Sequence, residues 1–284
     1  MKFTLAVAQI DTVLGDVAKN QKKHVDVTRR AKEGGADLVV FPELSLSGYS
    51  IRDSNWDVAL RPNDQTFLSG LLRESKDISI ILGVVEESRE FGIFNSALLL
   101  EQGKAAVVHR KTYPPTYGMF EELRYFSPGS ETKAFDSKLG RFGVLICEDF
   151  WHLPLPYLLA QDGAQVIIAI AASPTRLAGQ ESMEIARINS DQHRSYARLL
   201  SSYVVFSNRV GFEDGVNFWG GSEIVGPGGD VLVRGKFFEE DLIFADIDEN
   251  ELRRARRLSR HFLDDDPRLV QAELERIIRG RFPS

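Results

Sequence analysis

Short apolar runs alternate with amphipathic helical stretches along nearly all of this chain, and that alternation limits the fold more than any other feature. The apolar runs are rich in β-branched residues and end at Gly, Pro, Asp or charged residues, which is typical of strands. They cover residues 3–7, 36–41, 78–85, 96–100, 105–109, 142–146, 166–171, 204–207, 224–225, 231–233 and 242–245. Helical stretches are expected at residues 16–32, 65–72, 155–161 and 181–201. The pattern predicts a layered α/β fold.

Two pairs of predicted strands are separated only by a turn, at residues 101–104 and 226–229. A barrel built from single strand–helix repeats has no place for such hairpins, so we expect mixed sheets. With no linker or low-complexity stretch, residues 1–247 are predicted to form one domain. Residues 248–284 are highly charged, and Pro267 suits the first turn of a helix there. We interpret this part as a helical extension of the same domain at a subunit contact.

Charge and cysteine content exclude several classes of protein. The chain has 35 Lys and Arg against 41 Asp and Glu, a net charge of −6, which disfavours nucleic-acid binding. A single cysteine excludes an internal disulfide and a cysteine zinc cluster, and fits a cytoplasmic location. No apolar run is long enough to span a membrane. The five histidines form no metal-binding motif and no phosphate-binding loop is present, so we expect no metal and no cofactor.

The lone cysteine, Cys147, comes directly after the predicted strand at residues 142–146. A single Cys in an apolar strand is usually a small buried hydrophobe. Here, however, Glu148 and Asp149 follow at once, then Phe150 and Trp151. Sites in open α/β sheets lie at the carboxyl ends of strands, so this position favours a reactive thiol.

Two more charged residues follow predicted strands. Glu43 comes after Phe41-Pro42, and Lys111 opens a loop rich in proline and tyrosine at residues 112–126. Either residue alone could be an ordinary surface charge in a turn. Taken with Cys147, they give a carboxylate, an amine and a thiol, each just beyond the end of a predicted strand, and this combination is more informative than any one of the three.

This set of motifs resembles the nitrilase superfamily of carbon–nitrogen hydrolases over essentially the whole chain. The motifs are Ala8-Gln9, Phe41-Pro42-Glu43, Arg110-Lys111-Thr112, Cys147-Glu148-Asp149, Ala172-Ser173-Pro174 and the segments at 208–211 and 218–224. The resemblance implies a four-layer αββα sandwich with two mixed β-sheets. It also implies a homodimer or higher homo-oligomer, in which the C-terminal segment contributes to subunit pairing.

The resemblance further implies a Glu-Lys-Cys triad, and the residues suit that chemistry. Cys147 would attack an amide carbonyl as a thiolate, with Glu43 as the general base. Lys111 would offset the negative charge and, with the backbone N–H of Glu148, stabilise the oxyanion. Glu122 corresponds to a further glutamate that orients Lys111 and the substrate.

The substrate pocket is expected to include mostly aromatic and small polar residues near these motifs: Tyr49, Tyr117, Glu148, Phe150, Trp151 and Ser173. The sequence from Cys147 to Trp151, with Ser173-Pro174, is most similar to the glutaminase domains of glutamine-dependent NAD synthetases. That branch carries a basic residue beyond Ser-Pro, where this chain has Gly179, with Arg176 nearer.

Three functions remain open at this point. The first is an amidase that releases ammonia from a small carboxamide through a cysteine thioester. The second is a glutaminase-type subunit that supplies ammonia to a separate NAD synthetase. The third is a catalytically silent binding protein on the same fold.

Overall fold

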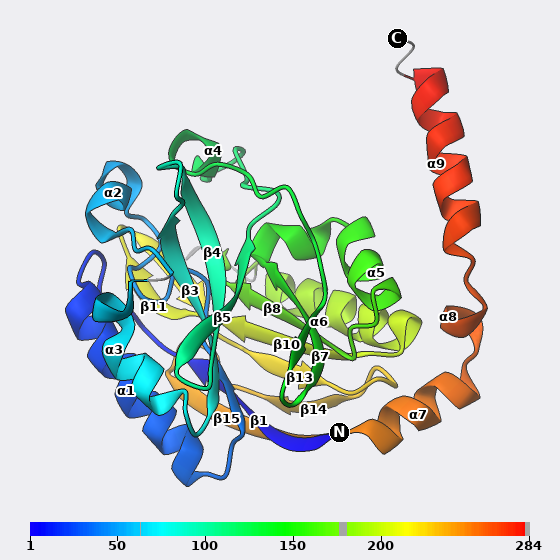
Figure 1. Cartoon of the computed structure of the whole chain (residues 1–284), viewed down its shortest axis with the longest axis horizontal. Coiled ribbons are helices and arrows are strands. Elements are labelled where there is room, and N and C mark those ends of the chain that lie inside the picture. Colours follow the sequence, from blue (N-terminus) through cyan, green and yellow to red (C-terminus); the bar gives the residue numbers. More distant parts are fainter. Residues whose placement is uncertain (63, 176–180, 282–284) are drawn as a thin grey trace.

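Two six-stranded β-sheets face each other in this computed structural model, which describes residues 1–62, 64–175 and 181–281 (Figure 1). The first sheet has the order β15 (Asp241–Asp248), β1 (Lys2–Gln9), β2 (Leu38–Val40), β3 (Ser79–Glu87), β4 (Ile93–Glu101) and β5 (Lys104–Arg110). The second has the order β14 (Val231–Arg234), β13 (Glu223–Val225), β10 (Tyr203–Asn208), β8 (Val166–Ala171), β7 (Gly140–Ile146) and β6 (Phe135–Ser137). In both, a parallel centre is flanked by antiparallel strands, so both sheets are mixed.

The central core lies between the two sheets, where alternate side chains of each strand meet. In β1, Leu5 and Val7 face this core, whereas Ala6 and Ala8 face the helical layer outside the first sheet. Val144 and Ile146 of β7 enter the same central core from the second sheet. This period of two along each strand fixes which residues reach the space between the sheets.

Helices cover the outer face of each sheet. The helices α1 (Val17–Glu33) and α3 (Gln65–Glu74) lie on the first sheet, and α5 (Pro154–Gln161) and α6 (Glu181–Leu200) lie on the second. Asp16 begins α1 by accepting a hydrogen bond from the backbone N–H of Lys19 at 2.9 Å, a standard N-cap. The predicted four-layer sandwich with two mixed sheets is confirmed.

Shorter elements complete the body of the molecule. They are η1 (Arg52–Ser54), α2 (Asn55–Val58), α4 (Glu122–Tyr125), η2 (Cys147–Trp151) and a small sheet of β11 (Val210–Glu213), β12 (Val216–Trp219) and β9 (Pro174–Thr175). Both α4 and η2 begin at residues of the predicted site. No helix in the described part of the chain is long and apolar enough to cross a membrane.

The C-terminal segment consists of α7 (Glu249–Leu258), α8 (His261–Asp264) and α9 (Pro267–Arg281). It is attached through Leu252 and Phe262, which are buried. In contrast, α9 points away from the body (Figure 1), and none of the residues 267–281 is buried. The helix starts at Pro267, as the sequence predicts, because proline fits the first helical turn.

Candidate active site

The predicted catalytic residues meet where strands of both sheets end. Glu43 follows β2 and Lys111 follows β5, both from the first sheet. Cys147 follows β7 of the second sheet and opens η2, and Glu122 opens α4. The two sheets therefore supply different chemistry to one place, charged groups from the first and the thiol from the second.

Lys111 is held between two carboxylates. Its Nζ donates to Glu43 Oε1 and to Glu122 Oε1, each at 2.7 Å. Asn95 Nδ2 donates to Glu43 Oε1 at 2.8 Å, and the backbone N–H of Ala172 donates to Glu43 Oε2 at 2.8 Å. The side chains of Lys111 and Glu43 are wholly inaccessible and that of Glu122 is 5% exposed. A charged cluster this deeply buried needs such pairing to be tolerated.

Burial and neighbouring charges shift the pKa values of this cluster. Burial would lower the pKa of Lys111, but Glu122 and Glu43 raise it well above its usual value, so the amine stays charged. Burial, opposed by Lys111 and reinforced by Glu43, raises the pKa of Glu122 to about 6. Burial and then Glu43 raise the pKa of the Cys147 thiol, against the influence of Lys111. The resting thiol is therefore protonated and needs a base to form the thiolate.

Cys147 sits on a sharp turn that Asp149 stabilises. Cys147 has a φ of +49°, in the left-handed region that residues other than glycine rarely adopt. The buried Asp149 carboxylate accepts from the backbone N–H of Ile146 at 3.2 Å, of Thr112 at 3.0 Å and of Tyr113 at 2.8 Å. These bonds tie the end of β7 to the end of β5, and so set Cys147 against Lys111.

Sequence reasoning did not assign roles to Asn95 or Asp149. Asn95 lies within β4, and nothing in its local sequence separates it from an ordinary buried polar residue. Asp149 had a usable signal, since a carboxylate three residues beyond a strand end can accept backbone N–H groups of the turn.

The predicted pocket residues occupy different surroundings. Tyr49 reaches the cluster, where its hydroxyl donates to Glu122 Oε1 at 2.6 Å. Tyr117 donates to Glu148 Oε2 at 2.8 Å, and Trp151 is 43% exposed nearby on η2. Ser173 follows β8, and its Oγ accepts from Trp219 Nε1 at 3.1 Å.

Phe150 differs from the other predicted pocket residues. Its ring is 2% exposed and packs beside His193 and Tyr196 in the core between the second sheet and its helices. In the short 3₁₀ turn η2, neighbouring side chains point in different directions, so Phe150 turns inward while Trp151 turns outward. Arg176 and Gly179 lie outside the described residues.

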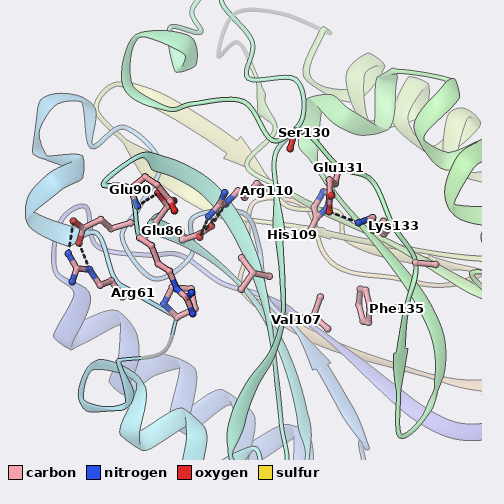
Figure 2. Close-up of a pocket in the computed structure, with 16 residues that line it drawn as sticks. Arg61, Glu86, Glu90, Val107, His109, Arg110, Ser130, Glu131, Lys133 and Phe135 are labelled. Carbon is pink, nitrogen blue, oxygen red and sulfur yellow. Dashed lines mark hydrogen bonds and ion pairs between the residues drawn. The ribbon is translucent and has the colours of Figure 1, made fainter.

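A cavity of about 830 Å³ lies apart from the catalytic cluster, along β5 and the end of β3 (Figure 2). Its lining includes Arg61, Arg110 and His109, but not Glu43, Lys111 or Cys147. Arg61 is paired with Glu87 at 3.0 Å and Arg110 with Glu86 at 2.6 Å, so these cations already have partners. In the described part of the chain, no group of three or more His, Cys, Asp and Glu side chains is placed to hold a metal ion.

Comparison with known proteins gives the family. The family model described as carbon-nitrogen hydrolase matches residues 4–257, and the chain belongs to that family. A glutamine-dependent NAD(+) synthetase from Acinetobacter baylyi is 32% identical over 88% of this chain, but over only 45% of the relative. The chain thus spans less than half the length of that curated relative.

Solved structures give the same fold. A glutamine-dependent NAD+ synthetase from Acinetobacter baumannii has a TM-score of 0.78 and 29% identity, covering 89% of this chain and 47% of that one. A carbon-nitrogen hydrolase from Helicobacter pylori G27 has a TM-score of 0.87 over 96% of this chain and 99% of that one. At 24% identity, the second likeness concerns the fold alone.

Proposed function

We propose that this chain hydrolyses the C–N bond of a small carboxamide through a cysteine thioester and releases ammonia. The supporting observation is the buried Lys111 ammonium, which is shared between Glu43 and Glu122 at 2.7 Å each and influences the Cys147 thiol. A base, a cation and a thiol are the groups that acyl transfer from an amide requires.

The geometry supports the following sequence of steps. Glu43 takes the thiol proton, and the Cys147 sulfur attacks the amide carbon. Lys111 Nζ and the backbone N–H of Glu148 stabilise the oxyanion. Protonated Glu43 then gives its proton to the leaving nitrogen, the C–N bond breaks and ammonia departs. Glu43 next takes a proton from water, whose oxygen attacks the thioester carbon. The C–S bond breaks, the carboxylic acid departs, and Glu43 returns its proton to the Cys147 sulfur.

Glutamine is the second candidate substrate, with the ammonia passed to an NAD synthetase. The support is the similarity to glutamine-dependent NAD synthetases over 88% of this chain. In this alternative, a separate synthetase would be the partner and release of ammonia would increase in its presence. A silent binding protein is the weakest alternative, because buried charges without a use are costly to maintain.

One experiment separates these functions. Ammonia release is measured with glutamine, asparagine, short aliphatic amides and a nitrile, with Cys147→Ala as the control variant. Turnover of an aliphatic amide but not glutamine supports the free amidase, and turnover of glutamine alone supports the ammonia-supplying subunit. If no substrate releases ammonia and Cys147 is also unreactive toward iodoacetamide at neutral pH, the result would favour a catalytically silent binding protein.

We also propose that residues 248–284 form a subunit contact in a homo-oligomer, as an extension of the domain at 1–247. The support is the exposed apolar side chains of α9, Leu269, Leu274 and Ile278 among them. A cytoplasmic location fits the mechanism, because Cys147 must stay reduced to act as a nucleophile. Sedimentation of the purified chain at several concentrations tests the contact.

A further inference from the structure

The β11–β12 hairpin packs against the segment that carries Tyr49. Glu213, the last residue of β11, accepts with Oε1 from the backbone N–H of Tyr49 at 2.8 Å and of Ser50 at 2.6 Å. Gly48 makes this approach possible, because a Cβ there would lie 2.6 Å from Glu213 Oε2. Phe218 of β12 meets the Tyr49 ring edge-on, with centroids 6.0 Å apart. The hairpin therefore holds both the backbone and the ring of Tyr49.

A buried arginine holds Glu213 in turn. Arg209 Nη1 donates to Glu213 Oε2 at 2.6 Å, and the two side chains are only 1% and 2% exposed. The guanidinium lies 4.3 Å from the centroid of the Phe218 ring, and its Nη2 is 3.3 Å from Asp11 Oδ1. A buried ion pair is weak evidence of stabilisation, since desolvation offsets much of its attraction. Its contacts with the Tyr49 segment point to a role in positioning instead.

Tyr49 links this pair to the catalytic cluster. Its hydroxyl donates to Glu122 Oε1 at 2.6 Å, the same oxygen that accepts from Lys111 Nζ at 2.7 Å. Burial and then the Glu122 charge raise the pKa of Tyr49 well above its usual value, so the phenol keeps its proton and remains a donor. The chain of contacts thus runs from Arg209 through Glu213, Tyr49 and Glu122 to Lys111.

We propose that Arg209 and Glu213 are positioning residues, which hold Tyr49 so that its hydroxyl keeps Glu122 charged and directed at Lys111. The kinetic test of this inference rests on the proposed hydrolysis. A second test does not, because the inference also predicts a change in the reactivity of Cys147 when no substrate is present. Neither residue touches the reacting atoms. Their effect reaches the reaction through one hydroxyl group, and removal of that group should remove the effect.

The test is a double-mutant cycle of Tyr49→Phe and Glu213→Asp. Phenylalanine keeps the ring but loses the hydroxyl, and aspartate keeps a charge near Arg209 but draws the carboxylate back from the Tyr49 backbone. Each single variant should lower kcat about tenfold or more. Each should also move the acid limb of the pH profile to higher pH, because the hydrogen bond from Tyr49 lowers the pKa of Glu122 against the larger effect of burial. The kcat of the double variant should be within about twofold of the kcat of the less active single variant.

The matched control is Glu87→Asp, which shortens a carboxylate that is ion-paired with Arg61 at the surface, and it should match the wild type. Thermal unfolding of every variant identifies loss of fold. Multiplicative losses in the double variant, or an unshifted acid limb in folded Glu213→Asp, would overturn the inference. Iodoacetamide alkylation of Cys147 across pH separates the two proposals. If no amide is turned over, the midpoint of the pH dependence of alkylation is compared with that of the wild type. Equal shifts of this midpoint in both single variants support the positioning role, and unequal shifts refute it.

Discussion

The buried charged cluster at the candidate active site and helix α9 differ in which side chains they bury. In the cluster, the charged side chains of Glu43, Lys111 and Glu122 are inside the protein, where the two carboxylates share the one ammonium at 2.7 Å each. In α9, apolar side chains are outside, with Leu269 63% exposed and Ile278 53% exposed. In most proteins, charged side chains are exposed and large apolar side chains are buried.

The contrast shows two different kinds of dependence. The cluster finds its partners within one chain, because Asn95 of β4, the hydroxyl of Tyr49 and the backbone of Ala172 all donate hydrogen bonds to its carboxylates. The described part of the chain leaves the apolar side chains of α9 exposed, and we propose that a second copy of the chain covers them. We therefore expect substitutions in the cluster to change chemistry and folding, and substitutions in α9 to change association.

Removal of the thiol should have the largest effect. Cys147→Ala is expected to lower ammonia release at least about 10³-fold, because no other group near Lys111 can form the thioester. Circular dichroism should show an unchanged fold. Release close to that of the wild type would place the nucleophile elsewhere in the chain.

Removal of the central cation should damage both folding and chemistry. Lys111→Met leaves Glu43 and Glu122 buried without their partner, which should lower the free energy of unfolding by about 3–5 kcal/mol in urea titration. The matched control is Lys133→Met, which breaks an exposed pair with Glu131 and should cost at most about 1 kcal/mol. Equal losses in the two variants would contradict a special role for burial.

The cluster should also titrate. A carboxyl group with a pKa of about 6 is charged only above that pH, so the attraction between Glu122 and Lys111 is lost as the pH falls through it. We expect the rate of ammonia release to fall below about pH 6. Glu122→Gln should lower the rate and remove that limb, and a limb that persists in this variant would belong to another group.

The exposed helix should give the smallest change in stability. Replacing Leu274 and Ile278 of α9 by glutamine should change the free energy of unfolding of the monomer by less than about 0.5 kcal/mol. Analytical ultracentrifugation should nevertheless show weaker self-association. For comparison, Leu252→Ala in α7, where the side chain is 3% exposed, should cost about 2–5 kcal/mol. A large loss from the α9 substitutions would mean that the helix packs on its own chain.

The sequence predicts the layers from the alternation of apolar runs and helical stretches. It also places Glu43, Lys111 and Cys147 just beyond the ends of strands, but their meeting is predicted only through the family resemblance, because Cys147 follows a strand of the second sheet and the other two follow strands of the first. The start of α9 at Pro267 is predictable on equally local grounds. The catalytic roles of Glu43, Lys111 and Cys147 stay predictions, whereas the predicted architecture is confirmed.

Other parts of the site depend on how distant segments pack. Glu213 is 164 residues from Tyr49, and no local pattern indicates that its carboxylate accepts the Tyr49 N–H. Asn95 is one of several polar residues in a buried strand, and its partners Glu43 and Glu122 come from segments distant in the sequence. Phe150 turns inward, and the five-residue 3₁₀ turn η2 is too short to show a repeating pattern from which that orientation could be predicted.

The left-handed backbone of Cys147, with a φ of +49°, sets stability against reactivity at the centre of the molecule. A side chain in this conformation costs on the order of 1–2 kcal/mol, whereas glycine adopts it freely. The residue that suits the turn best is therefore the one that cannot carry a thiol. A directed-evolution campaign that screened only for heat resistance would favour glycine at this position, and would enrich robust proteins that have lost the group on which the proposed reaction depends.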